Sequence, residues 1–263
     1  MLLDIHNLHL SFAGDTPTRI LHGIDLQVAP GEMVGLVGES GSGKSTTVRA
    51  ALRLYGDEAE VTGSIRIEGT EMVGADAATL RRTRASSVAL VQQDPRGALN
   101  PVRRIGDSLA ERLVRVHGMR RREADRRILD LLAEVGLTQP ARRMRQYPHE
   151  LSGGMLQRVV IAAALSTDPK LILADEATSA LDVTTQAEIV AIFQSQMRER
   201  ALGMLLITHD LHLAGAICDR VYVLRSGEIV ETLAGRNLFD AAEHPYTRAL
   251  IDAAPALERR TAS

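Results

Sequence analysis

Eight residues near the N-terminus have the types and the spacing needed to hold phosphate groups. Residues 38–45 read GESGSGKS: a glycine, four residues, a second glycine, a lysine and a serine. The glycines can adopt backbone conformations closed to other residues, so successive N–H groups can converge on one anion. Lys44 would reach the β- and γ-phosphates of a nucleotide, and the Ser45 hydroxyl would ligate Mg²⁺. The stretch therefore predicts a Mg²⁺-dependent nucleotide site.

Lysine usage supports this interpretation over a chance match in a Gly/Ser-rich loop. Of the 31 basic residues, 29 are arginine, and Lys44 and Lys170 are the two lysines. A compact ammonium and a planar guanidinium are not interchangeable at a phosphate loop. A chain that otherwise uses arginine has lysine where this chemistry requires it.

Acidic residues and a histidine follow two other apolar runs. Asp175 and Glu176 end the run that starts at Leu171, and His209 follows the run 204–207. Ligands of parallel sheets bind at the carboxyl ends of strands, where all three would meet the phosphate loop. Asp175 would hold the metal, Glu176 would orient or deprotonate water, and His209 would bond the γ-phosphate. A strand-end cap or salt bridge and a structural histidine are the alternatives.

A second candidate anion site precedes Asp175. Ser152, Gly153 and Gly154 lie at the predicted start of a helix, where unpaired N–H groups and the helix dipole favour an anion. One domain needs only one such site for one nucleotide. The second site suggests two domains that meet head to tail, each completing the other's site; an ordinary capped helix is the alternative.

Short apolar runs separated by turn residues supply the elements that would position these groups. The run 33–37 predicts a buried strand before the phosphate loop, and residues 45–54 predict the helix after it. Early strands without intervening helices predict an antiparallel layer beside the main sheet. The remaining predictions are strands at 2–12, 23–28, 63–69, 87–92, 171–175 and 204–207, a turn at 14–17, a hairpin of 221–224 with 228–233, and a helix at 184–200.

A helical insert is predicted from 94 to 166. It contains helical patterns at 105–117 and 123–135, with Gly136 as a C-terminal cap, and a third helix from the SGG stretch to about Ser166. From Arg103 to Arg145 there are 12 arginines and 6 acidic residues, which fits a solvated helix face, with RNA or an acidic partner as the alternative. The chain 1–263 would be one domain: an α/β core of 1–93 and 167–236, the insert, and a short C-terminal helical tail at 237–263, with two helices around His244-Pro245-Tyr246.

Composition excludes several classes of protein. The 263 residues carry a net charge of −2, 45% are hydrophobic and 24% are charged, which gives a substantial core and no basic footprint for nucleic acid. A single cysteine, Cys218, excludes an intramolecular disulfide or a cysteine zinc site and suits a reducing cytoplasm. No signal peptide or membrane-spanning run is visible, so other chains would cross any membrane involved.

LSGGMLQR, lying between GESGSGKS and LILADEATSALD and followed by ITHD, resembles the ATP-binding cassette (ABC) ATPase family over nearly the whole chain. The resemblance implies the α/β fold of a P-loop NTPase core with a parallel sheet, an antiparallel β layer and an inserted α-helical subdomain. It implies ATP and Mg²⁺ as cofactors. The implied phosphate-binding residues are Gly38, Glu39, Ser40, Gly41, Ser42, Gly43, Lys44, Ser45 and Thr46.

The same resemblance assigns the remaining roles. Phe12 would stack on adenine, and Gln93 would contact Mg²⁺ and water. Ser152, Gly153 and Gly154 would cap the γ-phosphate bound by a partner domain. Asp175 would be the metal acid, Glu176 the catalytic acid and His209 the switch histidine, with residues 179–182 coupling the two sites. Family members commonly have proline at Ala177 and tyrosine at Phe12, so these two positions depart from the pattern.

Three further segments narrow the resemblance to ATPases of dipeptide, oligopeptide and nickel importers: QDP…LNP from Gln93, YPHEL from Tyr147 and HPYTRAL from His244. The implied partners are two integral-membrane permeases, a second ABC ATPase of the same or a related chain and an extracytoplasmic solute-binding protein, with no nucleic acid. The chain would then lie on the cytoplasmic face of the membrane. A phosphonate-degrading complex, or a soluble ABC ATPase not coupled to transport, remains an alternative, and the transported substrate stays open.

Overall fold

A six-stranded sheet carries the phosphate-loop strand in its interior. The computed structural model describes residues 1–14, 18–179 and 181–254. The strand order is β10-β9-β3-β8-β7-β6, in which β10 pairs antiparallel with β9 and every other neighbouring pair is parallel. The strands are β3 (Met33–Val37), β6 (Val88–Val91), β7 (Leu171–Asp175), β8 (Gly203–Ile207), β9 (Arg220–Arg225) and β10 (Glu228–Ala234).

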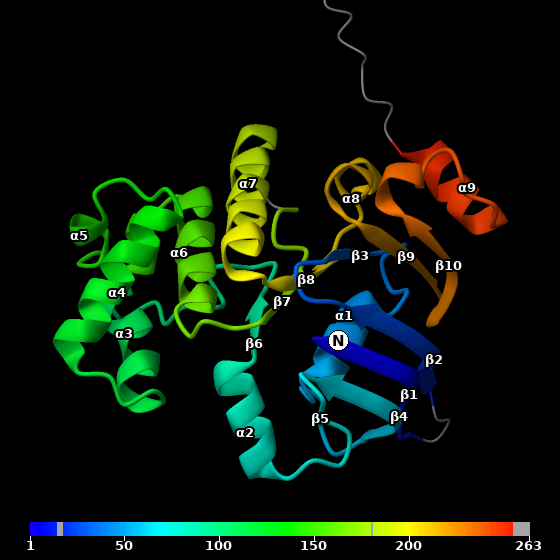
Figure 1. Ribbon diagram of the computed structural model, residues 1–263, viewed down its shortest axis with the longest axis horizontal. Coiled ribbons are helices and arrows are strands. Elements are labelled where there is room, and N and C mark those ends of the chain that lie inside the picture. The colour runs from blue at the N-terminus through cyan, green and yellow to red at the C-terminus, as the bar shows by residue number, and fades with distance from the viewer. Residues whose placement is uncertain (15–17, 180, 255–263) are drawn as a thin grey trace, which may run out of the picture.

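A second, antiparallel sheet of four strands lies beside the first, as the sequence predicted (Figure 1). Its order is β2-β1-β4-β5, formed by β1 (Leu3–Phe12), β2 (Thr18–Val28), β4 (Ala59–Ile67) and β5 (Thr70–Glu71). Its strands precede or directly follow the phosphate loop and α1 (Lys44–Ala51) in the chain. The sheet thereby packs beside the nucleotide strand without a crossover helix.

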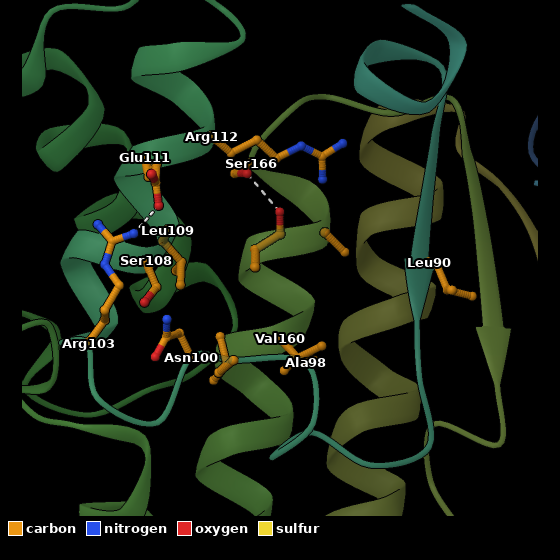
Figure 2. A pocket seen from close by; sticks show the side chains of 13 residues that line it. Leu90, Ala98, Asn100, Arg103, Ser108, Leu109, Glu111, Arg112, Val160 and Ser166 are labelled. Carbon is orange, nitrogen blue, oxygen red and sulfur yellow. Dashed lines mark hydrogen bonds and ion pairs between the residues drawn. The ribbon is translucent and has the colours of Figure 1, made fainter. Parts of the chain in front are cut away.

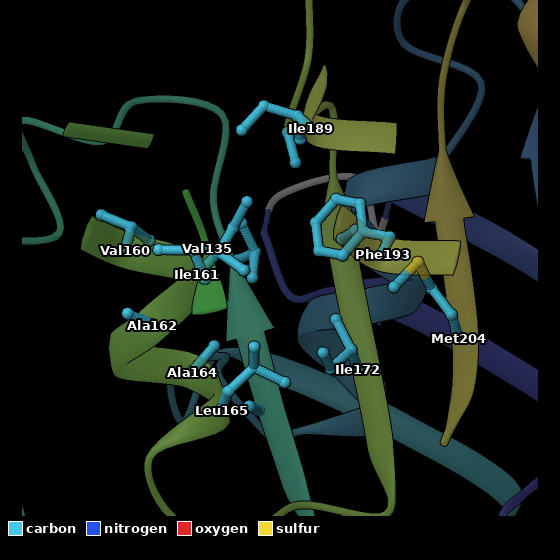
Figure 3. Close-up of a cluster of buried hydrophobic side chains, with 14 of the residues drawn as sticks. Val135, Val160, Ile161, Ala162, Ala164, Leu165, Ile172, Ile189, Phe193 and Met204 are labelled. Carbon is cyan, nitrogen blue, oxygen red and sulfur yellow. The ribbon is translucent and has the colours of Figure 1, made fainter. Parts of the chain in front are cut away.

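Alternation along the central strands divides the interior into two cores. In β8, Met204 and Leu206 face the helices, whereas Leu205 and Ile207 face α1 and the antiparallel sheet. Successive side chains of a strand point to opposite faces, so a strand buried on both faces reads as a continuous apolar run. Figure 3 shows the helix-side core, where α6 and α7 pack on the sheet through Ile161, Phe193 and Ile172.

The helices of the insert gather at one end of the molecule, and the tail helix lies at the opposite end (Figure 1). The insert contains α3 (Ile105–Arg115), α4 (Arg121–Glu134), α5 (Pro140–Arg143), the 3₁₀ turn η1 (Pro148–Glu150) and α6 (Gly153–Leu165). The other helical elements are α2 (Ala77–Ser86), α7 (Val183–Arg200), α8 (Leu211–Ile217), the 3₁₀ turn η2 (Gly235–Asn237) and α9 (Pro245–Ala253). No helix in the described ranges is long and apolar enough to span a membrane.

The α/β fold with its antiparallel layer and helical insert is confirmed, and the differences lie at particular elements. β2 begins at Thr18 rather than at residue 23, and β4 begins at Ala59 rather than at 63. Helix α2 was not predicted from the sequence. Within the described part of the tail there is one α-helix, α9, rather than two helices, and the 3₁₀ turn η2 ends at Asn237, where the tail begins. Most of the turn predicted at 14–17, and the tail after 254, lie outside the described residues.

Candidate functional site

The phosphate loop leaves β3 and enters α1 through three glycines with positive φ. Gly38 has φ 149°, Gly41 81° and Gly43 110°, all in the region that disfavours side chains. A Cβ on Gly38 would also lie 2.1 Å from the carbonyl oxygen of Leu224, so the loop passes directly against β9. Here glycine is required by backbone angle and by space together.

Lys44 closes the loop on itself. Its Nζ donates hydrogen bonds to the carbonyls of Gly38 at 2.8 Å and Glu39 at 2.7 Å, and its side chain is buried. Burial lowers the pKa of Lys44, and the neighbouring carboxylates of Glu176 and Asp175 oppose that shift. The ammonium therefore sits in a pocket that favours a further anion beside it.

Ser45 and Asp175 meet at the carboxyl ends of β3 and β7. The Ser45 hydroxyl donates to Asp175 Oδ1 at 2.8 Å, although the two residues lie 130 positions apart in the chain. Burial raises the pKa of Asp175, and the hydrogen bond from Ser45 opposes that effect. A hydroxyl beside a half-buried carboxylate is an oxygen pair suited to Mg²⁺.

The residues at this site fit a nucleotide bound together with Mg²⁺. No group of three or more His, Cys, Asp or Glu side chains that could hold a metal occurs within the described ranges. Mg²⁺ takes few protein ligands and completes its shell with water and phosphate oxygens, so Ser45 and Asp175 suffice when a nucleotide is bound. The hydroxyl of Ser42 in the same loop is buried without a hydrogen-bond partner among the described atoms, which also fits a phosphate ligand.

Glu176 stands at the centre of a polar group. Its Oε2 accepts a hydrogen bond from Gln93 Nε2 at 3.0 Å and lies 3.7 Å from His209 Nδ1. Gln93 also donates to Ser179 Oγ at 3.2 Å. Three strand ends, β6, β7 and β8, thus bring the predicted Gln93, Glu176 and His209 together, and the arrangement is suited to holding one water molecule.

The backbone of Glu176 is unusual. It has φ 49°, in the left-handed region, and its N–H donates to the carbonyl of Ile207 at 3.1 Å. Non-glycine residues there cost about 1–3 kcal/mol and persist where the surroundings hold them. This conformation turns the chain sharply after β7, and it occurs at Glu176, which the sequence analysis predicts to be catalytic.

Phe12 and Thr46 lie at the margins of the site. Phe12 ends β1, pairs with Thr18 of β2 and is partly buried. Two residues along β2, the carbonyl of Ile20 lies 3.5 Å from a Cβ built on Gly43. Phe12 is thereby one strand away from the phosphate loop, and Thr46 continues the loop into α1. Adenine stacking by Phe12 remains a prediction.

Ser152, Gly153 and Gly154 lie elsewhere, at the start of α6. Ser152 caps the helix by accepting a hydrogen bond from Met155 N–H at 3.3 Å. Figure 1 shows α6 among the insert helices and beside α7, away from α1. A Cβ on Gly154 would lie 2.8 Å from Thr185 Cγ2 of α7, whereas one on Gly153 would have no neighbour within 4 Å among the described atoms. The structure therefore does not join this stretch to the phosphate loop of the same chain.

No role for Tyr246 was predicted from the sequence. Its hydroxyl accepts a hydrogen bond from the backbone N–H of Glu39 at 3.1 Å, so the tail helix α9 reaches the phosphate loop. Its segment, HPYTRAL, carries only a family resemblance. The hydrogen bond spans 207 residues, and no pattern in the sequence points to it.

Comparison with known proteins agrees with this geometry. The profile of the ABC transporter family matches residues 21–179. The oligopeptide transport ATP-binding protein OppD of Mycobacterium tuberculosis is 42% identical over 260 residues, or 98% of this chain. The chain spans only 42% of that relative's length. The probable D,D-dipeptide transport ATP-binding protein DdpD of Escherichia coli is 41% identical over 97% of this chain and 78% of its own length.

Solved structures agree as well. The dimeric structure of a bacterial ABC transporter cassette superposes with a TM-score of 0.78 at 28% identity, covering 89% of this chain and 99% of that one. A post-hydrolysis state of the same cassette, also dimeric and bound to ADP and phosphate, gives the same TM-score and identity.

Proposed function

Because the chain belongs to the ABC transporter family, we propose that it is the ATP-hydrolysing subunit of a membrane importer for peptides. The observation that carries the proposal is the convergence of Lys44, Ser45, Asp175 and Glu176 at one edge of the sheet. The relatives named as oligopeptide and dipeptide transport ATP-binding proteins support the substrate class.

In this proposal the chain's own residues bind ATP and Mg²⁺ and orient the attacking water. The loop N–H groups and Lys44 hold the β- and γ-phosphates of ATP. Glu176 accepts a proton at Oε2 from the attacking water, which Gln93 and His209 hold in place. Ser45 and Asp175 hold Mg²⁺, which when bound supplies charge that stabilises the transferred phosphoryl group. Catalysis is then mostly positioning and electrostatics.

Hydrolysis in this proposal needs a second cassette. Ser152, Gly153 and the first turn of α6 would offer N–H donors to the γ-phosphate held by the partner. The solved dimeric cassette supports a two-cassette arrangement. ATP would close the pair, and hydrolysis would reopen it.

The permeases would dock where the insert meets the core. A cavity of about 370 Å³ lies between the chain after β6, α3 and the C-terminal half of α6 (Figure 2). Its rim carries the ion pair of Arg103 with Glu111, and its wall includes Leu109 and Val160. A permease segment seated here would touch both the insert and the segment that carries Gln93. Movement of the insert would then be transmitted to the membrane, with this chain on its cytoplasmic face.

Nickel or another metal chelate is the alternative cargo. The ATPase chain does not distinguish the two, since selectivity would lie in the permeases and the solute-binding protein. The test is to co-express the chain with the permease and binding-protein genes beside it and to measure ATP-dependent uptake into vesicles. Uptake of a labelled tripeptide is expected. Uptake of a nickel chelate alone would contradict the peptide assignment, and failure of the purified chain to hydrolyse ATP with these partners would contradict the enzymatic one.

A further inference from the structure

Tyr246 connects the last helix to the first peptide of the phosphate loop. Its hydroxyl accepts the N–H of Glu39 at 3.1 Å. Glu39, Ser40 and Gly41 are exposed, and the Gly38 before them has a φ that only glycine adopts readily. Residues 39–41 therefore have little packing of their own, so a single hydrogen bond to a rigid side chain has a large influence there.

Tyr246 is itself held firmly. The side chain is 8% exposed, and the guanidinium of Arg225 lies 5.0 Å from the centre of its ring. Its backbone N–H donates to His244 Nδ1 at 3.2 Å, in the N-cap of α9. The carboxylate of Glu231 on β10 accepts the backbone N–H groups of Glu243 and His244. The hydroxyl is therefore fixed to the central sheet through both its ring and its helix.

The peptide unit between Gly38 and Glu39 is held from two sides. It is trans, so its C=O and N–H point in opposite directions. Its C=O accepts from Lys44 Nζ at 2.8 Å, and its N–H donates to Tyr246. Whatever fixes the N–H also fixes the oxygen that orients the lysine.

We propose that Tyr246 is a positioning residue for ATP binding: it orients the Gly38–Glu39 peptide and, through that peptide, Lys44. The His244–Leu250 segment acquires a function through this contact, which is to fasten the tail to the phosphate loop. Without the hydroxyl, the peptide rotates more freely and Lys44 loses a fixed acceptor. The inference rests on the proposed ATP site and adds a residue far from it in sequence.

The test compares Tyr246→Phe with Tyr222→Phe. Tyr222 is a matched control because it is also buried, lies beneath an arginine (Arg220 at 5.4 Å) and accepts a backbone N–H, that of Gln27, at 3.3 Å. Each substitution removes one buried hydroxyl and one such hydrogen bond, so similar small losses in melting temperature are expected. The hydrogen bond of Tyr246 is with the phosphate loop, whereas that of Tyr222 is with β2.

For Tyr246→Phe, KM for ATP is expected to rise about threefold to tenfold, the range for one hydrogen bond, with kcat within about twofold of the wild type. Tyr222→Phe should leave KM unchanged. An unchanged KM in Tyr246→Phe, or an equal rise in both variants, overturns the proposal.

Hydrogen exchange separates this proposal from the proposed function. In nucleotide-free protein, the amide of Glu39 should exchange about fivefold faster in Tyr246→Phe than in the wild type or in Tyr222→Phe. If exchange is faster but none of the proteins binds ATP, the ATPase proposal is refuted, and the proposal that Tyr246 orients the Gly38–Glu39 peptide stands. Unchanged exchange together with normal ATP binding would refute the role of Tyr246 and leave the ATPase proposal intact.

Discussion

The phosphate loop and the start of α6 are both glycine-containing turns that open a helix, yet the fold treats them differently. At Gly38 a Cβ would strike the Leu224 carbonyl at 2.1 Å, so the chain itself requires glycine. At Gly153 a Cβ would meet nothing within 4 Å among the described atoms, and the residue is not in the left-handed region. Packing within the chain explains why residue 38 is glycine, but it does not explain why residue 153 is glycine.

The polar contacts differ in the same way. Around the loop, hydrogen bonds join Ser45 to Asp175 and Gln93 to Glu176 across the sheet. Lys44 donates to the carbonyls of the loop itself. At the start of α6, Ser152 bonds only its own helix, among the contacts described for it. The first region is assembled by folding, whereas the second is presented outward. The difference favours a head-to-tail pair, in which the second region serves a neighbouring chain.

Glu176→Gln should have the largest effect. It keeps the shape and removes the base, so hydrolysis should fall about 10²- to 10⁴-fold while ATP binding persists and the closed, ATP-filled dimer accumulates. Phosphate release and size-exclusion chromatography with ATP measure the two outcomes. Full turnover would remove Glu176 from its proposed role and break the contrast between the regions.

Ser152→Arg should lower hydrolysis about 100-fold with nearly unchanged ATP affinity, since the helix start serves the partner's nucleotide. Mixing this variant with Glu176→Gln sharpens the test. If sites are composite, a mixed pair carries both lesions in one site and none in the other, so activity should partly return. No recovery in a mixture shown to contain mixed pairs, or loss of affinity in Ser152→Arg alone, would contradict the head-to-tail arrangement.

A glycine pair tests the contrast in stability. Gly38→Ala should lower the free energy of unfolding by about 3 kcal/mol, because the new Cβ overlaps the backbone of β9. Gly153→Ala should raise it by about 0.5 kcal/mol, because alanine restricts the unfolded chain and fits the helix. Urea unfolding measures both, and equal losses would show that the start of α6 is constrained by its own chain.

Asp175→Asn should have the smallest effect on stability, and its sign depends on pH. Burial raises the pKa of Asp175 above its ordinary 3.8, so the folded state binds this proton more tightly than the unfolded chain. The stability from this group is present below the ordinary pKa and is lost as the pH rises through the raised value. At pH 7 the nucleotide-free variant should therefore melt slightly higher than the wild type, and the gap should close as the pH is lowered toward 4. A variant that melts lower at pH 7 would show that the carboxylate stabilises the fold.

Much of the fold and site was predictable because local patterns determine it. Leu171–Asp175 is a continuous apolar run ending in an acid, and the strand and its terminal carboxylate follow directly. Helix α2 escaped prediction because five of its ten residues, such as Arg81 and Arg82, are arginine or threonine and only Leu80 and Thr83 are buried. The contact of Tyr246 with Glu39 depends on how the tail returns across the sheet. Such long-range packing leaves no periodic trace in the sequence.

That return of the tail has a consequence for the order of events during synthesis. The ribosome adds roughly 5–20 residues per second, so Tyr246 emerges on the order of ten to forty seconds after Lys44. Until then the phosphate loop is complete in sequence but lacks the hydroxyl that holds its first peptide. A nascent chain would therefore reach full nucleotide affinity only after α9 has been made, which delays ATP-driven pairing until that helix can contact the loop.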